Sequence, residues 1–243
     1  MEEQWLRTRA LIGEEGLRIL ANSWVALFGL GGVGSFTAEV LARCGVGRLT
    51  LVDYDVVTAS NLNRQLVALH STVGKLKVEV MKERILDINP SAYVTTFPTS
   101  YNRETTDRII SQPYDYVVDA IDSVNDKLLL LQTCREKGIP VISCMGTGYR
   151  MNPSLLAVGD IRETSRCPLA RKIRRGLRQA GIEGGIKVVY SREDPRSVEK
   201  YPGVVPSMAL VPPAAGIMMA AEVVRDLLTV KGGVIEGRLP GHR

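Results

Sequence analysis

A cluster of glycines follows an apolar run near the start of the chain and favours an anion-binding loop. The run VALF (25–28) is typical of a buried strand, and the apolar spacing from 35 to 44 is helical. Glycine lets the backbone between them approach a ligand closely, and free N–H groups at a helix N-terminus attract phosphate. The sequence therefore predicts a phosphate-binding loop. Its glycines are Gly29, Gly31, Gly32 and Gly34.

An acidic residue at the end of the next apolar run extends this pattern to a nucleoside. The run 49–52 ends in Asp53, where a dinucleotide-binding fold has the acid that binds ribose. The loop and one acid alone would equally fit a nicotinamide-dependent dehydrogenase or a nucleotide-sensing module. Either alternative leaves Arg64, Lys77 and Asp122 without a role.

Three further motifs narrow the chemistry. SNLNRQ (60–65), GKLKVE (74–79) and DAIDSVNDK (119–127) follow the glycine loop in order. Together with FGLGGVGS (28–35), they resemble the adenylating superfamily of ubiquitin-activating enzymes and of the enzymes that activate sulfur-carrier proteins for thiamine and molybdopterin. RTRALIGEEGL (7–17) and CPLARKIRRGLR (167–178) make the chain most similar to the tRNA threonylcarbamoyladenosine dehydratases within it. The resemblance covers nearly the whole chain.

The resemblance implies roles for the cationic and acidic residues of these motifs. Arg64 and Lys77 are expected to contact the phosphates of ATP, and Asp122 is expected to hold Mg²⁺. The superfamily also uses an arginine from the partner subunit, for which Arg7 is the best match and Arg9 the rival. The remaining nucleotide contacts are expected from the glycines, Asp53, Asp55, Asn61, Gln65 and Lys127.

Several of these residues keep a structural alternative. Asp53 and Asp122 could be strand-end caps, and Lys127 could belong to an ordinary helix surface. Asn61 and Gln65 could serve only to shape the loop that aims the arginine of SNLNRQ.

The implied reaction is ATP-dependent adenylation of a carboxylate. The threonylcarbamoyl carboxylate on a tRNA adenosine attacks the α-phosphate of ATP, and the carbamoyl nitrogen then closes a ring and expels AMP. Positioning, cations and Mg²⁺ would carry this step, and no enzyme nucleophile is needed. The alternative is activation of the C-terminus of a sulfur-carrier or ubiquitin-like protein. The chain lacks the paired CxxC zinc motifs of that branch.

The four cysteines are scattered and predict neither zinc nor disulfides. Cys44, Cys134 and Cys144 are interpreted as packing residues of a reduced, cytoplasmic protein. Cys167 is expected to be a solvent-facing or half-buried thiol at a helix start, with a catalytic role less favoured. A sulfurtransferase partner and a bound monovalent cation stay open.

Strands are expected to alternate with helices along 25–145, and these elements position the motif residues. This order predicts an α/β fold with a doubly wound, Rossmann-like, mostly parallel sheet, helices on both faces and antiparallel strands added in the C-terminal part. The sequence predicts one adenylating domain over 1–243, with a nucleotide-binding core in 1–150. A basic substrate-binding extension and a buried closing helix (214–228) would make up 151–243.

A short helix over 14–20 is expected after a flexible leader. Three prolines interrupt the uncharged stretch 204–221, so no membrane segment is expected.

The excess positive charge of the chain is concentrated in one segment. Residues 151–200 hold 11 Lys and Arg against 6 Asp and Glu, whereas the net charge of the whole chain is +5. The helix predicted over 168–180 has four arginines on one face, and we expect them to bind tRNA phosphates. Leu169, Ile173, Leu177 and Ala180 would form its packing face. The arginines are Arg171, Arg174, Arg175 and Arg178.

An arginine acting across subunits and the apolar closing helix together predict a homodimer.

Overall fold

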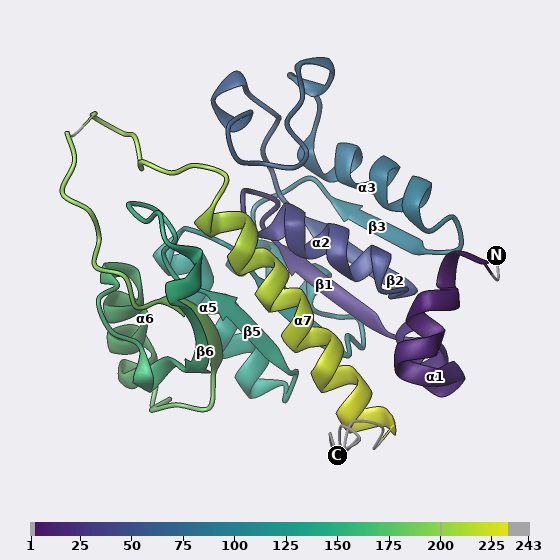
Figure 1. Ribbon diagram of the computed structural model, residues 1–243. Helices are drawn as coiled ribbons and strands as arrows, with labels where there is room; N and C mark the ends of the chain where they lie inside the picture. The colour runs from purple at the N-terminus through teal and green to yellow at the C-terminus, as the bar shows by residue number, and fades with distance from the viewer. Residues whose placement is uncertain (1–2, 200, 233–243) are drawn as a thin grey trace, which may run out of the picture.

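The computed structural model describes residues 3–199 and 201–232, and a seven-stranded sheet forms its centre (Figure 1). The strand order is β3-β2-β1-β4-β5-β7-β6, and all neighbours are parallel except the antiparallel edge pair β6 and β7. The predicted doubly wound α/β sheet is therefore confirmed. The strands are β1 (Trp24–Phe28), β2 (Arg48–Val52), β3 (Tyr93–Phe97), β4 (Tyr116–Asp119), β5 (Val141–Cys144), β6 (Leu156–Asp160) and β7 (Lys187–Ser191).

Helices cover both faces of this sheet. α1, α2, α3 and α7 share one apolar core, whereas α4, α5 and α6 contribute to the cores on the other side. The helices are α1 (Leu6–Ala21), α2 (Gly34–Arg43), α3 (Lys77–Ile88), α4 (Arg103–Ile109), α5 (Val124–Glu136), α6 (Pro168–Gln179) and α7 (Val211–Gly232). Short 3₁₀ turns occur at Glu3–Trp5, Ala59–Asn61, His70–Thr72, Pro153–Leu155 and Ile161–Glu163.

The interior strand β1 shows why several strands appear in the sequence as unbroken apolar runs. Val25 and Leu27 face the core under α2 and α7, and Ala26 and Phe28 face the core under α4 and α5. Successive side chains of a strand point to opposite faces, so a sheet covered on both sides favours apolar residues at successive positions.

The order of the strands opens a crevice beside β1. The chain runs outward from β1 through β2 to β3, then returns to add β4 on the other side of β1. Connections therefore leave the carboxyl ends of β1 and β4 in opposite directions, and ligands of open α/β sheets bind at such a point.

Close backbone packing requires glycine at two of the four predicted loop positions. A Cβ at Gly34 would lie 1.8 Å from the carbonyl oxygen of Gly29. Gly29 itself has a φ of 89°, and a Cβ there would lie 2.7 Å from the carbonyl oxygen of Ala120. Gly31, by contrast, has only the Gln65 side-chain nitrogen, at 3.9 Å, near its would-be Cβ. Gly29 and Gly34 thus let the start of α2 pack directly on the ends of β1 and β4.

The closing helix α7 packs against the same part of α2. A Cβ at Gly216 would lie 2.3 Å from the carbonyl oxygen of Val33, and the hydroxyl of Thr37 donates to the Gly216 carbonyl at 3.0 Å. Further along, Val223 and Leu227 are buried in the core. The prediction of a largely buried closing helix is confirmed, although the helix begins three residues earlier and ends four residues later than expected.

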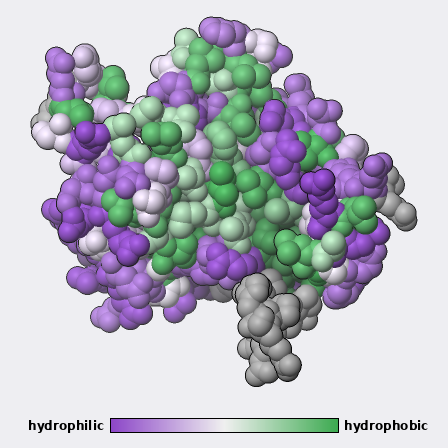
Figure 2. All heavy atoms as spheres, in the orientation of Figure 1, coloured by the Kyte–Doolittle hydropathy of each residue, from purple (hydrophilic) through white to green (hydrophobic). Residues whose placement is uncertain are grey.

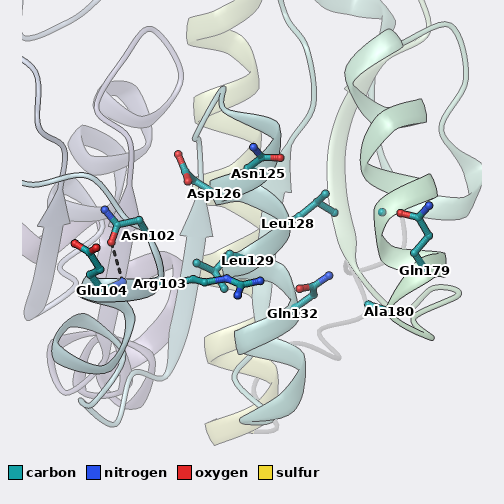
Figure 3. A pocket seen from close by; sticks show the side chains of 11 residues that line it. Asn102, Arg103, Glu104, Asn125, Asp126, Leu128, Leu129, Gln132, Gln179 and Ala180 are labelled. Carbon is teal, nitrogen blue, oxygen red and sulfur yellow. Dashed lines mark hydrogen bonds between the residues drawn. The ribbon is translucent and has the colours of Figure 1, made fainter.

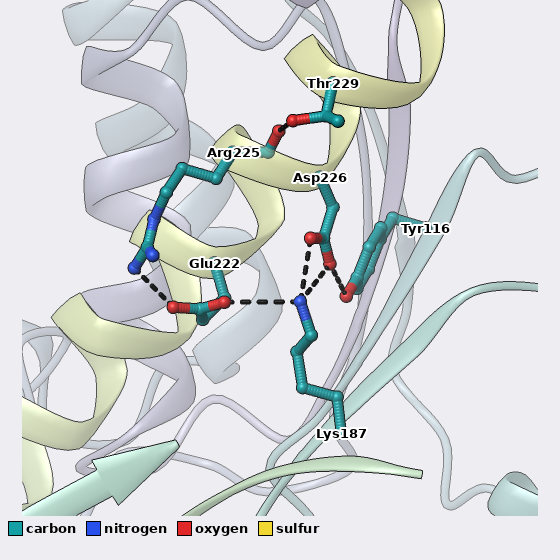
Figure 4. A network of polar contacts seen from close by, with 6 residues as sticks. All are labelled: Tyr116, Lys187, Glu222, Arg225, Asp226 and Thr229. Atoms are coloured by element: carbon teal, nitrogen blue, oxygen red, sulfur yellow. Dashed lines mark hydrogen bonds and ion pairs between the residues drawn. The ribbon is translucent and has the colours of Figure 1, made fainter. Parts of the chain in front are cut away.

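A polar network fastens the second half of α7 to the sheet (Figure 4). The Lys187 ammonium of β7 lies 2.7 Å from both carboxylate oxygens of Asp226 and 3.2 Å from Glu222, which also pairs with Arg225. The Tyr116 hydroxyl of β4 donates to Asp226 at 2.6 Å. Burial, and then this carboxylate, raise the pKa of Tyr116, so the phenol remains a donor. The network joins α7 to β4 and β7.

The N-terminal region differs from the prediction. Helix α1 begins at Leu6 rather than at residue 14, and it is kinked at Gly13, which has a φ of 74° and a ψ of 174°. The predicted flexible leader is therefore wrong for Arg7 and Arg9, both of which lie in the first half of α1. Glycine disfavours helix interiors, and Gly13 is the point at which the predicted helix and the first half of α1 are separated. None of the helices within residues 3–199 and 201–232 combines the length and apolar content of a bilayer span.

Candidate active site

A cavity of about 720 Å³ lies at the carboxyl ends of β1, β2, β4 and β5. It brings together all the residues predicted to bind nucleotide or metal except Gly34, Lys127 and Arg7. Gly34 lies behind the loop, where its role is the close packing described above. The predicted residues that line the cavity are Gly29, Gly31, Gly32, Asp53, Asp55, Asn61, Arg64, Gln65, Lys77 and Asp122.

Asp53 is held rigidly at the end of β2. One of its carboxylate oxygens accepts the Leu30 N–H at 2.6 Å and the other accepts the Asp55 N–H at 2.8 Å. Burial raises the pKa of Asp53, against the effect of these two hydrogen bonds and of the nearby Lys77 ammonium. Each oxygen keeps further lone pairs, so the carboxylate can also accept hydrogen bonds from two ribose hydroxyls.

Lys77 and Asp55 form an ion pair on the same side of the cavity. The Lys77 ammonium lies 2.7 Å from Asp55, and the Lys77 side chain is only 5% exposed. Lys77 is also the first residue of α3, so its position is fixed by a helix start. A lysine has three donors, and an anionic ligand could take those that Asp55 does not use.

Arg64 reaches the cavity from the loop between β2 and α3. Its guanidinium donates at 2.8 Å to the Ser60 carbonyl and at 2.8 Å to the Asn63 side chain, both within its own loop. Asn61 shapes this loop, because its side chain accepts the Thr58 N–H at 3.1 Å and its carbonyl accepts the Arg64 N–H at 3.1 Å. The loop-shaping alternative thus describes what Asn61 does, and it also lines the cavity.

Gln65 shows that the cavity fits a polar ligand. Its residue exposure is 8%, and its side-chain oxygen has no hydrogen-bond partner. A buried acceptor without a partner is costly, and a bound hydroxyl or N–H group would satisfy it. The orphaned amide lies beside Gly31 in the loop predicted to bind phosphate.

Asp122 and Asp126 supply carboxylates where β4 meets α5. Both line the cavity, and Asp122 is exposed to it. Within residues 3–199 and 201–232 there is no cluster of three His, Cys, Asp or Glu side chains that could hold a metal. Mg²⁺ is characteristically bound by one or two carboxylates together with the phosphates of a substrate. The two acids therefore fit a metal that arrives with a nucleotide.

Lys127 is placed differently from the prediction. Its ammonium is fully buried and donates to Asp119 at 2.7 Å, to Ser143 at 3.2 Å and to the Cys144 carbonyl at 3.1 Å. All three donors are therefore used inside the protein, and Lys127 does not line the cavity. Lys127 therefore occupies neither of the two positions considered from the sequence, a contact with the nucleotide or an ordinary helix surface. It joins α5 to β4 and β5 beneath the site.

Cys167 is more buried than predicted. Its residue exposure is 4%, and its sulfur lies at the N-terminus of α6 and accepts the Ala170 N–H at 3.4 Å. It lines the cavity together with Cys144, whose pKa is raised to about 12 mainly by burial. The expected solvent-facing or half-buried thiol is therefore wrong. Cys134 is fully buried, in keeping with a packing role.

Helix α6 presents three of the four predicted arginines. Arg171, Arg175 and Arg178 are exposed, whereas Arg174 donates to the Thr164 carbonyl at 2.7 Å and also contacts the Thr164 hydroxyl. Arg174 is thus used to hold the preceding loop. The helix packs through Ala170, Ile173 and Leu177, while Ala180, which was expected on this face, is exposed.

A second depression lies beside the cavity, between α4, α5 and α6 (Figure 3). Its volume is about 750 Å³, and amide and charged side chains line most of it. Gly176 allows α6 to pack closely on Leu128 of α5 at this place. Asp126 lines both spaces, so the depression continues the edge of the active-site cavity.

Sequence reasoning missed the wall of the cavity that follows β5. Thr147, Tyr149 and Lys172 all line it. GTGY (146–149) directly follows a predicted strand, and this was the available signal. Lys172 lies on the flank of α6, about 100° around the helix from Arg171, so neither the arginine face nor the packing face indicated it.

Comparisons with known proteins agree with this geometry. Residues 5–240 match the ThiF family. A Bacillus subtilis (strain 168) protein named tRNA threonylcarbamoyladenosine dehydratase is 44% identical over 243 residues, which is 94% of this chain and 96% of that protein. An Escherichia coli (strain K12) protein of the same name is 42% identical over 171 residues, or 70% of this chain and 64% of that protein.

Solved structures give the same answer for the fold. The crystal structure of E. coli tRNA N6-threonylcarbamoyladenosine dehydratase in complex with AMP has a TM-score of 0.88 at 34% identity, and it covers 94% of this chain and 95% of that one. The complex of that enzyme with ATP has a TM-score of 0.84 at 34% identity, with coverages of 95% and 97%. The motifs, the fold and a family match over nearly the whole chain agree, and the chain belongs to the ThiF family.

Proposed function

We propose that this protein is an ATP-dependent tRNA threonylcarbamoyladenosine dehydratase that acts in the cytoplasm. The observation that carries the proposal is a single cavity that gathers a glycine loop, a ribose-binding acid, two cations and an exposed carboxylate. The relatives of that name, at 44% and 42% identity, support the same activity.

Each group of cavity residues would bind a different part of ATP, according to the strand end at which it lies. Asp53 at β2 would bind the ribose, and the loop after β1 would hold phosphate. Lys77 and Arg64 would neutralise the charge that develops when the substrate carboxylate attacks the α-phosphorus and pyrophosphate leaves. The carbamoyl nitrogen would then attack the activated carbonyl carbon, and AMP would leave as the ring closes.

Mg²⁺ fits this scheme as a companion of the nucleotide. Asp122 would hold it, with Asp126 nearby. When bound, the ion would offset the negative charge of the triphosphate. The side chains of the cavity would still perform the binding and orientation.

Product formation tests the proposal directly. The protein is incubated with ATP, Mg²⁺ and tRNA bearing threonylcarbamoyladenosine, and AMP is measured together with the mass of the nucleoside. We expect AMP and a nucleoside lighter by one water. Parallel arms contain unmodified tRNA or a sulfur-carrier protein. AMP release only with the carrier protein would refute the proposal in favour of the alternative.

The exposed cations of α6 support tRNA as the substrate. Arg171, Arg175 and Arg178 have no acidic neighbour within the helix. Arg171→Ala combined with Arg175→Ala should weaken tRNA binding and reduce the slope of log affinity against log salt by about 0.7–0.9 for each lost contact. ATP affinity should not change. An unchanged slope in the double variant would show that this face does not bind tRNA phosphate.

A homodimer completes the proposal. Figure 2 shows an apolar band down the middle of the face where α2 and α7 lie, bordered by hydrophilic residues. Exposed apolar side chains in and just before α7 include Leu210 (40% exposed) and Ile217 (49%). Arg7 is exposed and does not line the cavity of its own chain, so a role in catalysis requires a second copy. Arg9 pairs with Glu14 at 2.7 Å and is the weaker candidate.

Subunit mixing tests the shared site. Arg7→Ala and Asp122→Ala chains are each expected to be inactive. Mixed dimers would contain one site with both native residues, so activity should return in part. If the chains exchange, as shown by differently tagged subunits, and no activity returns, Arg7 does not act across the interface.

A further inference from the structure

Tyr149 has an uncommon backbone conformation at the wall of the active-site cavity. Its φ is 61°, and within residues 3–199 and 201–232 only Arg166 is another non-glycine residue with positive φ. A bulky residue in this region is strained, and glycine would adopt it freely. Such strain persists only where the surroundings impose it, and it clusters at functional sites.

The surroundings of Tyr149 do impose it. The Tyr149 N–H donates to the Pro206 carbonyl at 2.8 Å, and its carbonyl accepts the Arg196 N–H at 2.9 Å. The next residue, Arg150, is 3% exposed and donates to the carbonyls of Gly146 at 3.2 Å and Arg166 at 2.9 Å. The backbone that carries the tyrosine is therefore clamped from several segments.

The position of Tyr149 along the sheet separates it from the expected adenosine of ATP. Asp53 directly follows β2, the glycine loop follows β1, Asp122 follows β4 and Tyr149 lies in the segment after β5. These four strands are consecutive in the sheet, so β5 lies three strand spacings, or about 14 Å, from β2. An ATP whose ribose binds Asp53 and whose phosphates bind the glycine loop has its base on the side away from Tyr149.

The neighbours of Tyr149 instead connect the cavity to the basic helix. Leu169 and Lys172 of α6 line the same cavity as Tyr149, and Lys172 is an exposed lysine. Lys172 directly follows Arg171, which lies on the proposed RNA-binding face. An RNA strand on that face would thus meet an aromatic ring and a cation on entering the cavity. Proteins read unpaired RNA bases mainly by stacking them on aromatic side chains.

We propose that Tyr149 is the residue on which the target adenine base of the RNA stacks, with Lys172 binding the adjoining phosphate. The inference rests on the proposed function and names the substrate-binding residue of that same site. Stacking of one base on one aromatic ring corresponds to an affinity change on the order of ten- to a hundredfold.

The test separates the ring from the rest of the residue. Tyr149→Phe keeps the ring, and Tyr149→Leu removes it while keeping an apolar side chain and the same backbone demand. We expect the Phe variant to resemble the parent. The Leu variant should raise the KM for modified tRNA by about ten- to a hundredfold. The Kd for ATP, from titration calorimetry, should be unchanged in both.

A third variant controls for strain. Tyr149→Gly removes the ring and relieves the positive φ, so it should unfold at or above the temperature of the Leu variant and still bind tRNA weakly. Tyr149→Trp adds a reporter whose fluorescence should be quenched by an oligoribonucleotide that contains threonylcarbamoyladenosine and not by ATP.

The outcomes are distinguishable. A raised Kd for ATP with an unchanged KM for tRNA would assign the ring to the ATP adenine and overturn the inference. An unchanged KM in the Leu variant, with AMP release by the parent, would overturn it while leaving the proposed function intact. No AMP release by the parent with modified tRNA would refute the proposed function itself.

Discussion

Two lysines near the site form ion pairs of the same length. Removal of one should mainly lower the stability of the fold, and removal of the other should mainly weaken ATP binding and turnover. Lys127 and Asp119 are 2.7 Å apart and both fully buried, whereas Lys77 and Asp55 are 2.7 Å apart with the Asp55 side chain 45% exposed. Lys127→Met would leave a buried carboxylate without its cation, which costs about 3–5 kcal/mol. For a chain of this size the melting temperature should fall by about 6–20 °C.

Lys77→Met should destabilise the fold far less. Its partner Asp55 can remain hydrated, so the loss should be about 0.2–1 kcal/mol, as for exposed pairs. Its functional effect should be the larger one, because a phosphate-facing cation is removed. We expect ATP binding to weaken and turnover to fall in the Lys77 variant at temperatures where it remains folded.

Urea denaturation followed by circular dichroism, with calorimetric ATP titration at 15 °C, measures both effects. The double variant Asp119→Asn with Lys127→Met serves as the matched control. It removes the unpaired charge and keeps an oxygen that can accept from Ser143, so much of the lost stability should return. The reasoning is refuted if Lys127→Met unfolds within 1 kcal/mol of the parent, or if Lys77→Met is destabilised as strongly as Lys127→Met.

Three further predictions concern the metal, the glycine loop and acid stability. Asp122→Ala should melt like the parent and lose turnover by a factor on the order of hundreds, and near-full activity would exclude a metal role. Gly34→Ala should abolish soluble, ATP-binding protein because its Cβ has no room, whereas Gly31→Ala should fold normally by circular dichroism. Burial alone would raise the pKa of Glu39, but hydrogen bonds from two arginines hold it below its ordinary value of 4.5. The stability that Glu39 contributes should therefore be fully present above about pH 5 and lost as the pH falls through its folded pKa. Urea titrations of the parent and Glu39→Gln should differ by a constant amount at neutral pH and converge in acid.

The sequence predicted the sheet and most of its strands because both faces of the sheet are buried. Runs such as 25–28 and 116–118 then contain no charged interruption, and this is a strong local signal. The cavity residues were predictable for a related reason, since motif residues directly after such runs must meet at one edge of a parallel sheet. Asp53 and Asp122 were placed in this way, whereas Arg64 and Lys77 were assigned through the family resemblance.

What the sequence could not predict depends on contacts between distant segments. Lys127 looks like a surface lysine until β4 and β5 place Asp119 and a carbonyl around its ammonium. Arg174 has the spacing of a residue on the exposed face of α6, yet its guanidinium donates to the Thr164 carbonyl of the preceding loop. Tyr149 owes its conformation to Pro206 and to a segment almost fifty residues away.

The close approach of α7 to α2 has a consequence for how the protein is made. Pro212 lines the cavity, and Gly216 packs on the first turn of the helix that follows the glycine loop, although α7 leaves the ribosome after all the motif residues. A nascent chain that already contains every catalytic residue therefore still exposes the apolar face of α2. Such a chain should depend on chaperones until α7 emerges. A fragment of residues 1–210 should accordingly be cut rapidly by trypsin whether or not ATP is present, whereas the full chain should be protected by ATP. Translation through α7, rather than synthesis of the motifs, is then the event that turns on nucleotide binding.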